Sequence, residues 1–413
     1  MDRYNKIFTR AGGALLCLAL IAFHLRAGFI PGWKDVNSDF PNYYVASRLA
    51  AEGRNLDSIY DNAWFNAEIR KRGMEQEGKF TPFPPSTLAL MLPFVSLEPL
   101  TAQRIWLVIN LFFIVALAAM IRKITGLSAW WSLNLLLLSG MALANNLYLG
   151  QVYVLMLFLA FLAWTRSAMA SGAVSGFLLG TAAAVKYFPV VFLLKYLAER
   201  KWKALLFFLA GILLLSLLPL LLHPGIYRDF FQAVFVPHLA GSIEGQSFFA
   251  WQFQSWNSLL GNLFLENPEG NQVMDSHAGF LLSKVFIHVF IAGSALYSLF
   301  RFRKNPLFSD WVIVVVPAAA LALLPASATY HFLFLLLPLV LLINMLRQAQ
   351  RDSAMIVTAG LFSLIGFAPF LLERFVDMEE VFFLFRYSRL YLVTAFFFWT
   401  LWSGNLILRS RLQ

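Results

Sequence analysis

The chain has 413 residues, of which 60% are hydrophobic and 13% are charged. A soluble domain carries about 25% charged residues, so this composition excludes an ordinary soluble protein and indicates a polytopic membrane protein. The formal net charge of +10 comes in small groups at the ends of apolar segments, which is typical of membrane topology and not of a nucleic-acid-binding surface. The single cysteine, Cys17, excludes a disulfide framework.

The apolar segments predict an all-α protein with twelve membrane spans. The first segment is long enough to cross a bilayer, and no small-residue cleavage site follows it, so we expect a retained span and not a cleaved signal. The predicted spans are 7–30, 100–121, 128–147, 150–166, 172–185, 188–198, 202–222, 277–300, 309–325, 330–346, 353–372 and 388–408. The short apolar segment 86–98, interrupted by Pro93, is predicted only to dip into the membrane.

Lysine and arginine residues set the orientation of this arrangement. They concentrate on the side that holds both chain ends, which the positive-inside rule makes cytoplasmic. A second twelve-span model, with 86–98 as a span and 172–198 as one helix, moves Gly150 and Gln151 to the inner side. In both models the two long loops, 31–99 and 223–276, face outside, and residues 1–413 form one integral membrane domain.

The first outer loop combines carboxylates with aromatic side chains. Asp35 and Asp39 lie where the first apolar segment ends, and the spacing of Phe40, Tyr43 and Tyr44 predicts an amphipathic helix beside the membrane. A second helix is predicted over 57–72. The alternative for Asp39 is a helix N-cap, because Pro41 suits the first turn of a helix.

The second outer loop is also aromatic. His223-Pro224-Gly225 predicts the start of an interfacial helix. In the segment 246–258, aromatic rings alternate with amide and hydroxyl side chains, including Trp256 and Asn257. This mixture suits a sugar, whose C–H faces pack on rings and whose hydroxyl groups need polar partners. The alternative is an aromatic belt at the membrane surface.

Common catalytic templates do not occur in the sequence. It contains no glycine-rich phosphate loop and no nucleophile elbow. It also contains no pair of histidines at positions i and i+4, so we expect no metal site held by histidines, and only an ion site made of carboxylates is left open. Instead, Lys186 interrupts an apolar stretch, and His331 and Gln151 lie on short turns between spans. A cation at membrane depth is costly without a function, although each polar residue could also cap a helix end.

The predicted topology brings several of these residues to one outer face. Asp39 would lie there with Lys186, His331 and the loop around Asn257. A carboxylate that accepts a hydroxyl proton, together with cationic donors that hold a departing phosphate, is what sugar transfer from a lipid phosphate requires.

Over about the first two thirds of the chain, short motifs follow one another in an order that resembles a known family. The motifs are Asp39-Phe40-x-x-Tyr43-Tyr44-x-Ala46, Phe80-Thr81-Pro82-Phe83-Pro84-Pro85, Gly150-Gln151, Gly176 and Gly180 before Lys186-Tyr187-Phe188-Pro189, and Asn257-Ser258-Leu259. This succession resembles the polyprenyl-phosphate-mannose-dependent mannosyltransferases of glycosyltransferase family 87, which have the GT-C membrane fold. The likeness implies mannose transfer from a polyprenyl phosphate to a lipid or glycan hydroxyl, on the outer face of a bacterial inner membrane, without a nucleotide sugar.

The resemblance implies that Asp39 is the catalytic base, with Asp35 as the alternative. We expect inversion at the anomeric carbon, no metal and no cofactor beyond the lipid-linked donor. Tyr153 stands where family members often have asparagine, a departure that bears on the acceptor and the sugar. Arg374 and Arg389 are further candidates for the phosphate. The expected substrate-binding residues are Tyr43, Tyr44, Gln151, Lys186, Trp256, Asn257 and His331.

Three rival functions remain at this point. A lipid or oligosaccharide transporter would show repeated halves and ionisable groups in mid-membrane, whereas here the polar residues gather in two unequal outer loops. A GT-C enzyme for another lipid-linked sugar would share every feature above. A non-catalytic assembly protein of the cell envelope would turn over no lipid-linked sugar.

Overall fold

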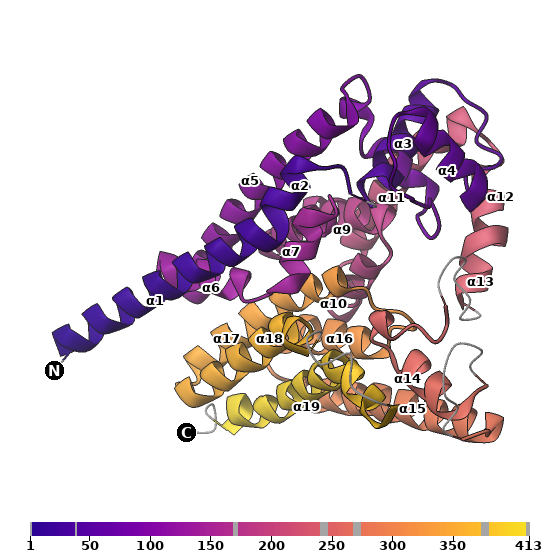
Figure 1. Ribbon diagram of the computed structural model, residues 1–413. Coiled ribbons are helices and arrows are strands. Elements are labelled where there is room, and N and C mark those ends of the chain that lie inside the picture. The colour runs from indigo at the N-terminus through magenta and orange to yellow at the C-terminus, as the bar shows by residue number, and fades with distance from the viewer. Residues whose placement is uncertain are drawn as a thin grey trace. The chain divides into compact units, whose positions relative to one another are not determined.

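The computed structural model describes residues 2–37, 39–167, 172–239, 247–266, 274–372 and 380–409. These residues form helices and no strands (Figure 1). The chain separates into two compact units. Unit 1 contains Met1–His24, Val115–Leu143 and Phe248–Gln413, and unit 2 contains Leu25–Ile114 and Ala144–Ser247.

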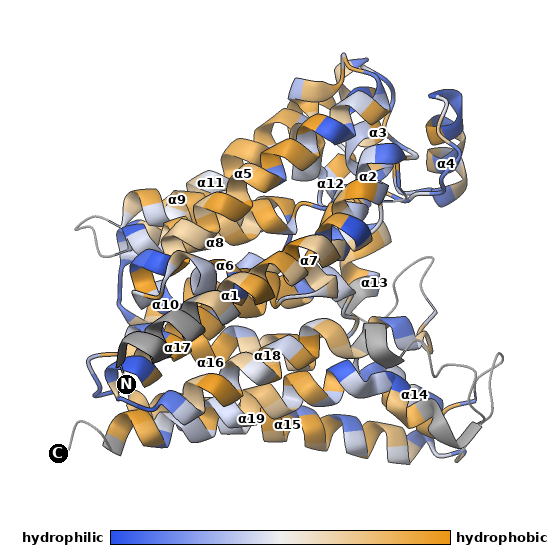
Figure 2. Cartoon of the chain, turned by 60° about the vertical axis from the view of Figure 1, so that its left-hand side comes forward, coloured by the Kyte–Doolittle hydropathy of each residue, from blue (hydrophilic) through white to orange (hydrophobic). Residues whose placement is uncertain are grey.

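Six stretches of helix among the described residues are long and apolar enough to cross a membrane, which confirms an all-α polytopic protein. Figure 2 shows α5 largely in the hydrophobic colours. A seventh span results if α7 (Met141–Tyr148) and α8 (Tyr153–Arg166), which meet at a bend of 119°, are counted as one. The six are Ala11–Lys34 (from α1, Asp2–His24, through α2, Ile30–Lys34), Pro99–Thr125 (α5), Trp202–Leu222 (α11), His277–Phe302 (α15), Thr329–Gln348 (η7, Thr329–Leu335, and α17, Leu336–Gln348) and Leu384–Leu408 (mostly α19, Ser388–Arg409).

The remaining predicted spans fall on helices that do not meet these length criteria within the described residues. Glycines in the left-handed backbone conformation separate some of these helices from their neighbours. Examples are Gly140 between α6 and α7 and Gly172 at the start of α9. These helices are α6 (Ala129–Leu137), α9 (Ala173–Val185), η4 (Phe188–Leu193) with α10 (Leu194–Ala198), α16 (Phe308–Leu323) and α18 (Asp352–Leu372).

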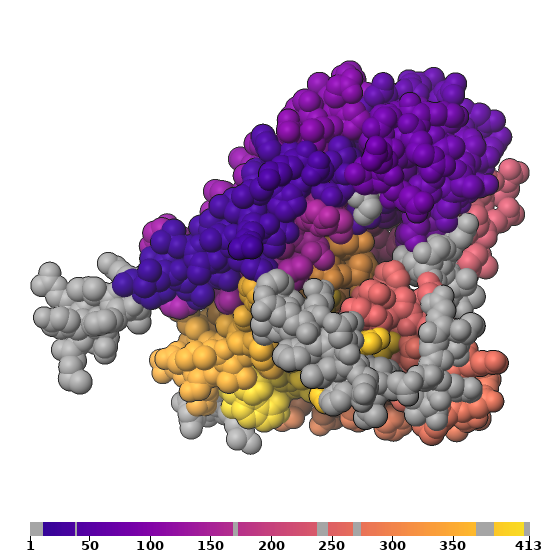
Figure 3. Space-filling view, viewed as in Figure 1, coloured from indigo at the N-terminus to yellow at the C-terminus, as the bar shows by residue number. Residues whose placement is uncertain are grey.

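The first outer loop forms a packed layer and not a loose excursion. Both predicted helices are present, as α3 (Phe40–Ala51) and α4 (Asn62–Lys71), and α3 is buried along most of its length. The segment predicted to dip into the membrane is the pair of 3-10 turns η2 (Pro85–Ala89) and η3 (Leu92–Phe94). Figure 3 shows the side chains of this loop, in indigo and violet, as one continuous mass.

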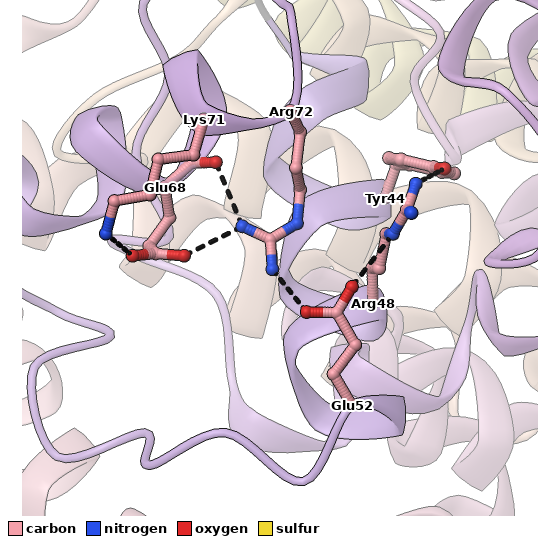
Figure 4. A network of polar contacts seen from close by, with 6 residues as sticks. All are labelled: Tyr44, Arg48, Glu52, Glu68, Lys71 and Arg72. Carbon is pink, nitrogen blue, oxygen red and sulfur yellow. Dashed lines mark hydrogen bonds and ion pairs between the residues drawn. The ribbon is translucent and has the colours of Figure 1, made fainter.

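An ion-pair network joins α3 to α4 (Figure 4). Arg72 contacts Glu52 at 2.5 Å and Glu68 at 2.8 Å, and Lys71 contacts Glu68 at 2.5 Å. The Glu68 side chain is only 3% exposed, so these cations replace the water that its carboxylate would otherwise bind. The network therefore ties the C-terminal end of α3 to the C-terminal end of α4.

The second outer loop contributes to both units. In unit 2 the helix predicted after Gly225 is observed as α12 (Ile226–Phe230), η5 (Phe231–Phe235) and α13 (Val236–Leu239). In unit 1 the loop forms η6 (Trp251–Phe253) and α14 (Trp256–Phe264). Gln246, at the start of the aromatic segment, lies outside the described residues.

Unit 2 contains a very close helix pair, α9 with α11. A Cβ atom placed on Gly176 would lie 2.0 Å from the Ala204 carbonyl oxygen, and one on Gly180 would lie 2.0 Å from that of Phe208. Glycine is the residue that permits such backbone proximity between membrane helices. The pair fixes the axis and the end of α9, where Lys186 follows.

Unit 1 packs α15 to α19 around large buried side chains. The ring of Trp311 on α16 stacks on Phe302 at the end of α15, with centroids 4.3 Å apart, and its indole nitrogen donates to Ser298 at 3.0 Å. The 3-10 helix η9 (Glu380–Tyr387) leads into α19. Trp311 is fully buried, so this cluster anchors the basic end of α15.

Candidate active site

Asp39 occupies the N-cap position of α3 without capping it. Its side chain makes no hydrogen bond to the first turn. Instead its Oδ2 accepts a hydrogen bond of 2.6 Å from Nε2 of Gln151, 112 residues further along the chain. The helix-cap alternative for Asp39 is therefore wrong, because the carboxylate turns away from the amides that a cap would satisfy.

The bend between α7 and α8 presents Gln151 to Asp39. Gly150 has a φ of +65°, and a Cβ atom there would lie 2.9 Å from that of Phe40, so glycine allows the turn to pack on the start of α3. The Oδ1 atom of Asn146 accepts hydrogen bonds from the backbone of Tyr153 at 2.9 Å and so caps α8. Asn146 thus has a structural role at this turn.

Lys186 follows the end of α9 in extended backbone conformation. The last carbonyl groups of a helix lack intrahelical partners, and here two hydroxyl groups of η2 supply them. Ser86 donates to the Ala184 carbonyl group, and Thr87 donates to that of Val185 at 3.2 Å. The first outer loop is thereby docked on the end of α9, beside the lysine.

Aromatic rings surround the Lys186 ammonium group. Its Nζ lies 3.6 Å from the ring centroid of Phe83 and 5.5 Å from those of Tyr43 and Tyr153. Lys186 is 8% exposed, and a cation removed from water gains from such ring faces. The sequence departure at Tyr153 therefore places an aromatic ring against this cation.

Asp39 and Lys186 form an electrostatically coupled pair. Burial raises the pKa of the Asp39 carboxyl above its ordinary value, while the hydrogen bond from Gln151 and the charges of Lys186 and Lys79 work in the opposite direction. Burial lowers the pKa of Lys186 to about 7, against the effect of Asp39. A base and a cation whose pKa values are both displaced toward neutrality are typical of a catalytic centre.

Two other residues of the first outer loop lie apart from this pair. Tyr44 directs its hydroxyl group to the Leu97 carbonyl oxygen at 2.5 Å and receives a hydrogen bond from Arg48. Asp35, the alternative base, is exposed and contributes its backbone carbonyl group to Gln103. Asp39 is thus the carboxylate that interacts electrostatically with Lys186.

The predicted site residues of the later chain belong to unit 1. Trp256 packs on the apolar cluster of Leu259, Tyr387 and Leu390. Asn257 is buried, and its side-chain oxygen has no hydrogen-bond partner among the described residues.

His331 and Arg389 lie at neighbouring positions of unit 1. The Nδ1 atom of His331 accepts a hydrogen bond from the Ala328 amide at 2.9 Å, so the ring proton of the neutral form is on Nε2. Arg389 is buried and donates to Thr329 at 2.8 Å. Arg374 lies outside the described residues. The structure therefore groups Asp39, Tyr43, Gln151 and Lys186 in unit 2, and it places Trp256, Asn257 and His331 in unit 1.

One group in the described part of the chain has the donor atoms for a metal ion. Asp57, His223 and Asp229 each offer a donor atom, and these atoms lie within 4.8 Å of one another. The sequence shows no histidine pair at this group, because its members come from two loops. Arg228 contacts Asp229 at 3.3 Å, and Nε2 of His223 lies 2.8 Å from the Asp57 carboxylate.

The family profile described as glycosyltransferase family 87 matches residues 80–316, more than half of the chain. The chain is a member of glycosyltransferase family 87. The match confirms the resemblance drawn from the sequence motifs, and this family 87 protein is a membrane glycosyltransferase with a sugar donor and an acceptor. No curated protein and no solved structure matches the chain.

Several residues of this family 87 site were not predicted from the sequence. Phe83 was noted only as part of a motif, yet its ring is the nearest to the lysine ammonium group. Ser86 and Thr87 carry no signal, because hydroxyl groups that cap a helix end have no characteristic sequence spacing. The matched residues include Gln151 and Lys186 but begin after Asp39.

Proposed function

We propose that this family 87 enzyme transfers a hexosyl unit, mannose, from a polyprenyl phosphate to a hydroxyl group of a lipid or glycan, on the outer face of a bacterial inner membrane. One observation carries the proposal: Asp39 is held beside Lys186 and aromatic rings, although a helix start would ordinarily use its carboxylate as a cap. The two opposite charges suit the two ends of the transfer reaction.

The proposed reaction is a single displacement. Asp39 accepts the proton of the acceptor hydroxyl group, whose oxygen forms a bond to the anomeric carbon. The bond from that carbon to the phosphate oxygen breaks, and the electron pair leaves with the lipid phosphate. One base and no carboxylate nucleophile give inversion, by analogy with inverting hydrolases.

A cationic side chain would stabilise the departing phosphate. We assign this role to Lys186, whose ammonium group interacts electrostatically with Asp39. A preorganised donor of this kind lowers the barrier because it needs no reorganisation as negative charge develops. A divalent ion is then unnecessary.

Purified protein incubated with labelled polyprenyl-phosphate mannose and envelope lipids would test the proposal. We expect a labelled product that still forms in EDTA, and we expect Asp39→Asn to lower the rate at least about a thousandfold. Asp35→Asn is the matched control and should keep near wild-type activity. A demand for a nucleotide sugar would refute the donor assignment, and full function of Asp39→Asn would favour a transporter.

A further inference from the structure

A chain of three side chains holds the Asp39 carboxylate. The Tyr43 hydroxyl group donates to Oε1 of Gln151 at 2.5 Å, and Nε2 of Gln151 donates to Oδ2 of Asp39 at 2.6 Å. Tyr43 and Gln151 are both fully buried. Water therefore does not compete for the hydrogen bond between Tyr43 and Gln151, whereas the bond to Asp39 is partly buried.

The orientation of the Gln151 amide follows from the groups at its two ends. An ionised carboxylate can only accept a hydrogen bond, so the amide must direct its NH2 group toward Asp39. A phenol can donate, and Tyr43 satisfies the amide oxygen at the other end. A reversed amide would place two acceptor oxygens face to face at Asp39.

The backbone of Gln151 is held as firmly as its side chain. The indole nitrogen of Trp106 donates to the Gln151 carbonyl oxygen at 3.2 Å, and Gly150 precedes it in left-handed conformation. Among the described residues, Gln151 is the side chain that donates a hydrogen bond to the Asp39 carboxylate. Because Oδ2 accepts this bond, Oδ1 is the oxygen that can accept the proton of a substrate hydroxyl group.

We propose that Gln151, oriented by Tyr43, is a positioning residue that holds Asp39 by Oδ2 and directs Oδ1 toward the acceptor hydroxyl group. The inference rests on the proposed role of Asp39 as the base. It differs from the sequence-based expectation that Gln151 and Tyr43 bind the substrate. A residue that acts through Asp39 changes the proton affinity of the carboxylate, whereas a substrate contact does not.

The proton affinity of Asp39 can be measured without any sugar donor. A hydrophobic carbodiimide adds to buried carboxyl groups in their protonated form, so the labelling of the peptide that contains Asp39, followed by mass spectrometry across a pH series, reports its titration. Asp39→Asn removes the label and identifies the signal. The ionisable groups Lys79, Lys186 and Tyr153 also interact with Asp39, and the variants below leave them in place.

Gln151→Met keeps the side-chain volume but removes the donor. The labelling midpoint should rise by about one pH unit, since one hydrogen bond to the carboxylate is lost. Tyr43→Phe should raise the labelling midpoint by about half as much. This variant replaces Gln151→Met in the test if Gln151→Met does not fold. Tyr44→Phe is the matched control on the same helix, because its hydroxyl group bonds to Leu97 and not to Gln151, and it should leave the midpoint unchanged.

Transfer kinetics separate positioning from substrate binding. For Gln151→Met we expect kcat to fall while KM for donor and acceptor stays near the wild-type value. Folded Gln151→Met and Tyr43→Phe proteins with unchanged labelling midpoints would overturn the proposal, as would a raised KM at unchanged kcat. Because labelling needs no donor, a wild-type enzyme inactive with polyprenyl-phosphate mannose would refute the proposed function alone.

Discussion

At the scale of single residues, the decisive feature is the pairing of Asp39 with Lys186 in a setting that disfavours both charges. Burial raises the pKa of the carboxyl and lowers that of the ammonium group to about 7. Each group favours the charged form of the other, and the hydrogen bond from Gln151 and the rings around Lys186 also favour the charged forms. The form that the proposed mechanism requires, with both groups charged, therefore occupies a limited pH range.

The pH dependence of transfer should be bell-shaped. The base must be ionised, so the rate should fall as pH drops through the raised pKa of Asp39. The cation must be protonated, so the rate should also fall as pH rises through the lowered pKa of Lys186, near 7. Measurement of kcat/KM between about pH 4 and pH 10 with a fixed lipid-linked donor checks this. A flat profile across that range would contradict it.

Changing Lys186 tests the alkaline limb separately. Lys186→Arg keeps a positive charge throughout this range, so its alkaline limb should disappear even if its rate is lower. Lys186→Met removes the charge, and we expect the acid limb to move to higher pH because Asp39 loses a stabilising partner. Lys195→Met is a control, because that buried lysine pairs with Glu199 at 2.8 Å, whereas the described cations that act on Asp39 are Lys186 and Lys79. An unmoved acid limb in Lys186→Met would refute the coupling.

At the scale of elements, the contact between α9 and α11 determines where Lys186 lies. Gly180→Ala should reduce the free energy of unfolding by about 3 kcal/mol, because the added methyl group would lie 2.0 Å from a carbonyl oxygen of the facing helix. Gly360→Ala is the matched control, since nothing lies within 4 Å of its added Cβ atom. The temperature at which half of the detergent-solubilised protein aggregates should fall by several degrees for Gly180→Ala only. Equal values for both would contradict this packing.

The ion-pair network of the first outer loop makes a second prediction at this scale. Arg72→Met leaves the buried Glu68 with Lys71 as its remaining ion-pair partner in the described network, at a cost of about 2 kcal/mol. Arg48→Met breaks a half-exposed pair with Glu52 and should cost less than about 1 kcal/mol. Amide hydrogen exchange over residues 52–72 should accelerate strongly in the first variant and little in the second.

The elements also show what the sequence could and could not reveal. Helical spacing predicted α3 and α4, and hydropathy predicted the long spans, because both patterns are local. The turn between the predicted spans 128–147 and 150–166 is present between α7 and α8, but the break at Gly140 inside 128–147 was not predicted, since apolar composition is the same in a straight and a broken helix. Asp39 and Lys186 were predicted as reacting groups, whereas the contact of Gln151 with Asp39 depends on how that turn packs on α3, which no local pattern specifies.

At the scale of the whole molecule, the sequence predicts that both long loops lie on one side of the membrane. In a Cys17→Ser background, single cysteines at Arg54 and Asp275, both exposed, would report this. We expect an impermeant maleimide to label both in intact spheroplasts. Labelling of only one position would refute the predicted topology, and a cysteine at exposed Lys123 is the control that should react only after the membrane is opened.

The docking of Ser86 and Thr87 on the end of α9 has a consequence for biogenesis. Asp39 and its loop leave the ribosome before Lys186 is synthesised, so the young chain carries the carboxylate without its partner cation. The two hydroxyl groups can bond to the end of α9 only after that helix has formed. The pairing of Asp39 with Lys186 is therefore a late step in the assembly of this unit.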